Sequence, residues 1–143
     1  MSDRSVISRF VAAQDAVYED VLQELRTGQK TSHWIWYVFP QLTGLGHSLM
    51  SQRFALSGAE KARAYLAHPQ LGWRLRECTR LIIEIKDRNI FDILGSPDDM
   101  KFHSCMTLFN AVVSIEPLWR EALDLFFAGE PDTRTLSMLH VHQ

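Results

Sequence analysis

The densest group of side chains that could do chemistry lies between positions 33 and 41. This segment reads His-Trp-Ile-Trp-Tyr-Val-Phe-Pro-Gln and holds two of the four tryptophans of the chain. Histidine can serve as an acid, a base or a ligand near neutral pH, and an indole ring offers a stacking face to a base. Large aromatic side chains also dominate protein interiors, so the same rings could be core. The candidate ligand-binding residues in this segment are His33, Trp34, Trp36 and Gln41.

A turn with two glycines follows directly, Thr43-Gly44-Leu45-Gly46-His47-Ser48. Such a turn before a helix start presents backbone N–H groups that suit a phosphate or a carboxylate. It is not a Walker loop, because the lysine is missing and the glycines stand too close together. Arg53 follows further along and could neutralise an anion. The alternative interpretation is an ordinary turn.

A third set of polar residues lies between positions 98 and 110. Lys101, Ser104 and Thr107 follow at intervals of three, so their side chains are neighbours on a helix. A lysine beside a hydroxyl could form a nucleophile–base pair, and the alternative is a solvated helix face. Asp99, Lys101 and Ser104 complete the candidate ligand-binding set, and no catalytic residue can be named.

The two cysteines, Cys78 and Cys105, lack the paired spacing of a zinc site and are too few for a disulfide framework. Both fall on apolar faces of expected helices, so we interpret them as reduced core residues. We expect neither a metal nor a cofactor.

Length and composition indicate one domain over residues 1–143. Hydrophobic residues make up 46% of the chain and charged residues 22%, which is ordinary globular usage. The net charge of -2 argues against a nucleic-acid or anionic-membrane partner. The longest apolar run, 34–39, is far shorter than the ~20 residues that span a bilayer. With no secretory signal at the start, we expect a cytoplasmic protein, and a monomer is favoured.

Apolar residues at helical spacing predict one long helix over residues 5–27, ended by Gly28. Segment 33–41 has strand-like composition. No second strand is visible to pair with it, so a buried short helix or an irregular segment is expected. Ser48 can cap a short helix through Leu56. Ser57 and Glu60 form a capping box for a helix that ends near His68.

The second half of the chain continues with helical signals. Ser96 and Pro97 read as a capping serine followed by proline at the first helical position. The remaining expected elements are a helix over 71–85, a short element over 89–94, a helix to about 113, one over 117–128 and a last one from Asp132 to about Leu139. The sequence predicts an all-α single domain of about seven helices with a buried aromatic segment.

Several blocks together resemble a known family. They are Arg9-Phe10-Val11 with Gln14, the His33–Gln41 block with Gly44 and Gly46, Ala64-Tyr65-Leu66, Leu75-x-Glu77-Cys78, Asp98-Asp99-x-Lys101, Ser104 and Met106-Thr107-Leu108-Phe109. The chain resembles the bacterial family catalogued as domain of unknown function 1810 over nearly its whole length. The resemblance implies a mainly helical single domain and implies no established activity.

Two functional hypotheses remain. In the first, the protein is a helical domain that binds a small anionic, nucleotide-like ligand beside segment 33–41. In the second, it is an N-glycosidase-like enzyme acting on an ADP-ribose or nucleotide-like substrate, although no catalytic glutamate can be aligned. A ligand site requires the polar candidates to converge on one cleft beside Trp34 or Trp36, whereas a purely structural role leaves them scattered or acting as caps.

Overall fold

The structure is a computed structural model that describes residues 3–141, with side chains described from residue 5 to residue 140. Its elements, in chain order, are α1 (Asp3–Thr27), α2 (Ile35–Val38), β1 (Gln41–Leu42), α3 (Leu49–Arg53), β2 (Ala55–Leu56), α4 (Ala59–Ala67), α5 (Pro69–Glu84), α6 (Ile90–Leu94), α7 (Asp98–Val112), α8 (Pro117–Phe127) and α9 (Thr133–Val141). The all-α prediction is confirmed. The described part holds two more helices than the seven expected, because α2 and α6 form as short helices.

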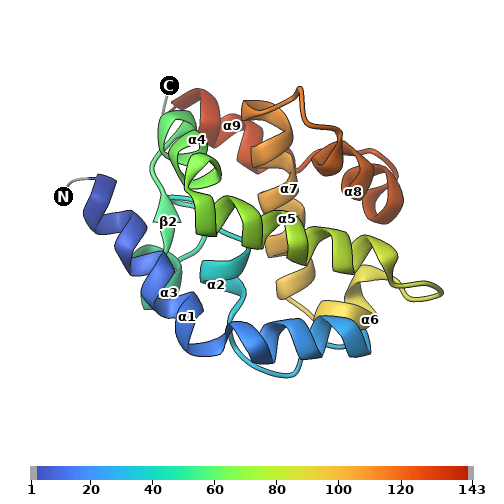
Figure 1. Ribbon diagram of the computed structural model, residues 1–143. Helices are drawn as coiled ribbons and strands as arrows, with labels where there is room; N and C mark the ends of the chain where they lie inside the picture. Colours follow the sequence, from blue (N-terminus) through green and yellow to red (C-terminus); the bar gives the residue numbers. More distant parts are fainter. Residues whose placement is uncertain (1–2, 142–143) are drawn as a thin grey trace.

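Helix α7 occupies the centre of the molecule. It packs against α8 and α9 on one side and against α4, α6, α2 and β1 on the others (Figure 1). A helix surrounded in this way is buried around most of its circumference. Its buried residues are Phe102, Ser104, Cys105, Met106, Thr107, Leu108 and Phe109. The alternative of a solvated face is therefore wrong for Ser104 and Thr107.

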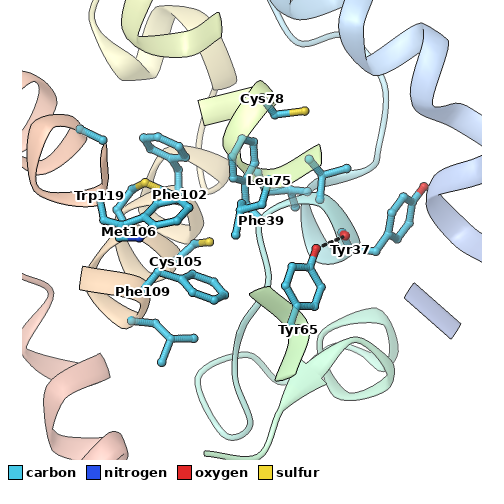
Figure 2. Close-up of a cluster of buried hydrophobic side chains, with 14 of the residues drawn as sticks. Tyr37, Phe39, Tyr65, Leu75, Cys78, Phe102, Cys105, Met106, Phe109 and Trp119 are labelled. Carbon is cyan, nitrogen blue, oxygen red and sulfur yellow. Dashed lines mark hydrogen bonds between the residues drawn. The ribbon is translucent and has the colours of Figure 1, made fainter. Parts of the chain in front are cut away.

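The core is built largely from aromatic rings. Phe39 meets Phe102 of α7 edge to face, with ring centroids 5.0 Å apart. Two turns further along α7, Phe109 contacts Trp119 of α8 and Tyr65 of α4 (Figure 2). Edge-to-face and tilted pairs of this kind add stability beyond the area that they bury.

Residues 34–40 of the aromatic segment, which include α2, are buried, except that Trp36 is only half-buried. Gln14, on the inner face of α1, fixes the segment from one side. Its amide donates to the carbonyl of Tyr37 over 2.6 Å and to the hydroxyl of Tyr65 over 3.0 Å. The Tyr65 hydroxyl also donates to the carbonyl of Tyr37, as the dashed line in Figure 2 shows. These bonds satisfy polar groups that would otherwise be buried without partners.

The expectation that no strands pair is wrong. Gln41 pairs with Ala55 and Leu42 with Leu56, in parallel, so β1 and β2 form a two-stranded sheet. The expected helix from Ser48 ends at Arg53 instead of Leu56, because residues 55–56 join this sheet. The pairing brings together the two ends of segment 43–54, which contains the glycine-rich turn.

Most helix boundaries agree with the sequence, but two caps do not. Helix α4 begins at Ala59 with Gly58 as its N-cap and no side-chain cap, so the Ser57–Glu60 capping box is wrong. Helix α7 has Pro97 in the N-cap position, so Ser96 does not cap it. In both places the helix begins one residue later than the motif requires, which moves the serine out of reach of the free N–H groups.

Candidate functional site

Trp34 is an anchor of the core and not a pocket wall. Its ring is 1% exposed, and its indole Nε1 donates to Glu24 of α1 over 3.0 Å. The Glu24 carboxylate also accepts the backbone N–H groups of Thr31 and Ser32 and the Ser32 hydroxyl, over 2.6–2.9 Å. Burial acts to raise the pKa of Glu24, but these donors outweigh it and lower that pKa. We call these groups the Glu24 network.

An ion pair joins the Glu24 network to α7. Lys30 Nζ lies 2.7 Å from Asp98 Oδ2, and the two side chains are 5% and 19% exposed. The same ammonium stands 4.9 Å from the centre of the Trp34 ring and donates to the Ser32 carbonyl. Sequence reasoning missed Glu24 and Lys30. The available signal was a glutamate between Leu22 and Leu25, on the apolar face of the first helix.

Ser104 ties α7 to α9. Its hydroxyl donates to Asp132 Oδ2 over 2.9 Å, and the Thr135 hydroxyl donates to the same oxygen over 2.5 Å. Thr107 Oγ1 accepts the backbone N–H of Asp132 over 2.9 Å. Although burial opposes it, these donors and nearby His103 lower the pKa of Asp132. Ser104 therefore holds the start of α9.

The turn between β1 and α3, residues Thr43–Ser48, is called the glycine loop below. Gly44 has a φ of +98°, which a residue with a side chain adopts only with strain. A Cβ atom on Gly46 would lie 2.5 Å from both Cβ and Oγ of Ser51, so only glycine fits there. The Ser48 hydroxyl accepts the backbone N–H of Ser51 and caps α3 as predicted. Local packing thus accounts for both glycines.

Lys101 is the predicted residue that reaches the glycine loop. Its Nζ lies 4.0 Å from the position that a Cβ atom on Gly46 would take. The side chain is half-buried, and no hydrogen bond or ion pair joins it to any residue that the structure describes. Along one edge of α7, Asp98 is thus bonded to Lys30, Ser104 is bonded to Asp132, and Lys101 between them has no such partner within residues 3–141.

The glycine loop has backbone N–H groups that have no acceptor among the described residues. Within the described part of the chain, the N–H groups of Gly46, His47 and Ser48 form no hydrogen bond. Two side chains hold carbonyl groups of the same loop. Arg134 Nη2 of α9 donates to the Leu45 carbonyl, and Gln52 Nε2 donates to the His47 carbonyl, each over 3.1 Å. Sequence reasoning missed Arg134 and Gln52 as neighbours of this loop.

The other predicted residues lie in varied surroundings. His33 is exposed, whereas Trp36 packs against the core from a half-buried position. Gln41 is the first residue of β1, and Arg53 is exposed with its guanidinium over the Phe54 ring. Asp99 accepts the backbone N–H of Met100 in the first turn of α7. No hydrogen bond or ion pair within residues 3–141 joins any two of the eight predicted site residues.

The two cysteines lie in the core, as their places on apolar helix faces predicted. Cys78 and Cys105 are buried and reduced, and burial raises the pKa of the Cys78 thiol to about 12. Among the described residues there is no group of three or more histidine, cysteine, aspartate or glutamate side chains that could hold a metal ion. None of the helices between residues 3 and 141 combines the length and apolarity that a bilayer span requires.

Comparison with known proteins gives a family and a close structural relative. The profile of a family described as "Protein of unknown function (DUF1810)" matches residues 4–139. The crystal structure of the conserved hypothetical protein Rv1873 from Mycobacterium tuberculosis, at 1.38 Å, superposes with a TM-score of 0.92. The two sequences are 45% identical, over 94% of this chain and 96% of that one. No curated protein matches. The matched profile covers nearly the whole chain, and the chain therefore belongs to the DUF1810 family.

Proposed function

We propose that the glycine loop and Lys101 form a binding site for a small anionic ligand that carries a phosphate or carboxylate group. The observation that supports this proposal most strongly is the Lys101 ammonium, which stands beside Gly46 without an ionic partner among the described residues. A half-buried cation is stabilised by an opposite charge, and here the bound ligand would supply it.

The backbone beside Lys101 adds the directional part of the site. Successive backbone N–H groups in a turn can bind an anion together, and those of Gly46, His47 and Ser48 form no hydrogen bond within the described residues. One cation and several fixed N–H donors match the charge and the oxygens of a phosphate group.

The surroundings of Glu24 and Asp132 favour a binding role over an N-glycosidase-like reaction. A general acid in such a reaction works best when its pKa lies near the working pH. The pKa values of Glu24 and Asp132 are lowered, so both groups are ionised at neutral pH. Their hydrogen bonds also serve the 28–34 segment and α9. The proposal is therefore a ligand-binding role.

Isothermal titration calorimetry tests the proposal, with inorganic phosphate, AMP and ADP-ribose as separate probes. We expect at least one probe to bind the wild-type protein. Lys101→Gln should weaken that binding by about 10- to 100-fold, the equivalent of one charged hydrogen bond. The matched control is Lys86→Gln, which removes the same charge from an exposed lysine after α5.

Two outcomes of these titrations would contradict the proposed anion site. Absence of heat for all three probes at millimolar concentration would contradict the proposal. So would equal weakening by the Lys101 and Lys86 variants, because the effect would then come from overall charge. A circular dichroism melt of each variant checks that the fold is kept.

A further inference from the structure

Arg134 reaches the glycine loop from the last helix of the described chain. Its Nη2 donates to the Leu45 carbonyl over 3.1 Å, although 89 positions separate the two residues. We infer that Arg134 is a positioning residue of the anion site, which aims the Gly46 N–H at the ligand by holding the Leu45 carbonyl. The inference rests on the proposed function of this loop.

The geometry of the peptide bond links the Leu45 carbonyl to the direction of the Gly46 N–H. The carbonyl of Leu45 and the N–H of Gly46 belong to one planar trans unit, in which they point in opposite directions. A carbonyl held toward α9 therefore turns the N–H away from α9. Arg134 need not touch the ligand to set the direction of this donor.

Without the hydrogen bond from Arg134, the peptide unit between Leu45 and Gly46 would rotate easily. Gly44 and Gly46 flank Leu45, and glycine allows backbone rotations that other residues resist. A loop with two glycines pays a conformational cost when a ligand orders it. A hydrogen bond that is already present in the free protein removes part of that cost, which is the effect of preorganisation.

The hydrogen bond from Arg134 to the Leu45 carbonyl is itself anchored to a buried helix. The start of α9, two residues before Arg134, is tied to α7 by the hydrogen bond from the Ser104 hydroxyl to the Asp132 carboxylate and by the one from the Asp132 backbone N–H to Thr107 Oγ1. Lys101 lies on α7 as well, less than one helical turn before Ser104. Helix α7 therefore carries the Lys101 ammonium and also holds the start of the helix that carries Arg134. The bond from Gln52 to the His47 carbonyl acts on the next peptide unit but one.

Met138 gives α9 a second contact with the loop. A Cβ atom on Gly44 would lie 2.5 Å from the Met138 Cε atom, so α9 packs directly on the loop. Arg134 and Met138 are four residues apart and share one face of α9. This face therefore forms the outer wall of the glycine loop, and the site is complete only when α9 is docked.

The test is a titration with inorganic phosphate followed by two-dimensional ¹H–¹⁵N NMR, in which the Gly46 amide reports its own hydrogen bond. We expect the Gly46 amide proton of the wild-type protein to move downfield on binding. Arg134→Gln removes the cationic donor and shortens the side chain, and it should weaken phosphate binding by about three- to tenfold, because the bond to the Leu45 carbonyl acts on the ligand only indirectly. It should also reduce the downfield movement of Gly46 at saturation.

Two further variants separate positioning from charge. Arg134→Lys keeps a donor for the Leu45 carbonyl and should restore much of the affinity and of the Gly46 signal. Arg120→Gln removes the same charge from an exposed arginine of α8, which pairs with Asp124, and should leave both readouts unchanged. Amide signals of α1 confirm that each variant is folded.

The outcomes distinguish this inference from the proposed function. If the wild-type protein binds phosphate and Arg134→Gln binds it equally well with an unchanged Gly46 signal, the positioning role is overturned while the site remains. Equal weakening by the Arg134 and Arg120 variants also overturns it, because charge alone then explains the result. If the wild-type protein binds no phosphate, the proposed site and the role of Arg134 in it both fail.

Discussion

Glu24 is a carboxylate on the inner face of α1 that organises the whole 28–34 segment. Its two oxygens accept hydrogen bonds from two backbone N–H groups, one hydroxyl and the Trp34 indole. Hydrogen bonds to a charged group are stronger than those between neutral groups. The network fixes Trp34 in the core, which is why we place the proposed ligand at the glycine loop and not at the aromatic segment.

The lowered pKa of Glu24 makes stability depend on pH. A carboxyl group with a lower pKa in the folded state stabilises that state above its unfolded pKa, near 4.5, and this contribution is lost as the pH falls through the folded value. We expect Glu24→Gln to lower the free energy of unfolding by about 1.5–3 kcal/mol at pH 7. The difference from the wild-type protein should shrink below pH 4.5.

Urea unfolding at a series of pH values measures this effect. Glu19→Gln, an exposed glutamate on the same helix, serves as the control and should change little. A Glu24→Gln difference that stayed constant down to pH 2–3, well below the unfolded pKa, would show that the charge of Glu24 does not stabilise the network.

At the scale of single residues, the glycines of the loop and Lys101 could be picked out from the sequence, but the residues that contact the loop could not. Two glycines before a serine cap are visible in the sequence, and so is a lysine in the first turns of a helix. The bond from Arg134 to Leu45 joins positions 89 residues apart. Such a pairing depends on how helices pack, which no local pattern encodes.

At the scale of elements, α7 is the helix beside which three other segments lie. Asp98, Lys101 and Ser104 recur every three residues along one edge. Asp98 pairs with Lys30 of the 28–34 segment, Ser104 bonds to Asp132 at the start of α9, and Lys101 between them lies beside the glycine loop. A polar edge on a buried helix thus positions three connections relative to one another.

Removing the Ser104 hydroxyl should loosen the attachment of α9. Ser104→Ala takes one donor from the Asp132 carboxylate, and we expect it to lower the free energy of unfolding by about 1–3 kcal/mol. Equilibrium unfolding in urea provides the measurement, with the exposed Ser137→Ala of α9 as control. A change below about 0.5 kcal/mol, the range of neutral surface substitutions, would argue against this role.

Helix boundaries were predictable wherever a cap or a breaker agreed with the apolar spacing. Gly28, Gly95 and Gly129 all stand just after helices, and each has a positive φ. The serine caps at Ser57 and Ser96 failed, because a shift of one residue in the start of a helix cannot be read from a motif. The strands escaped detection because each has only two residues, too few to show alternation.

At the scale of the molecule, the aromatic core supplies much of the stability. Phe39 is 0% exposed and packs between Trp34 and Phe102, whereas Trp36 is only half-buried. Phe39→Ala should cost about 3–5 kcal/mol through lost burial and the cavity left behind. Trp36→Ala should cost clearly less. Equal melting temperatures for the two variants would contradict this assignment of the core.

The central claim, that an anion binds between the glycine loop and Lys101, is tested most directly by a crystal structure with arsenate. Arsenate is an isostere of phosphate, and anomalous scattering locates its arsenic atom. The account predicts one anomalous peak within contact distance of Lys101 Nζ and the Gly46 N–H in wild-type crystals, and no such peak in Lys101→Gln crystals. A peak elsewhere, or one that persists in the Lys101→Gln variant, would contradict it.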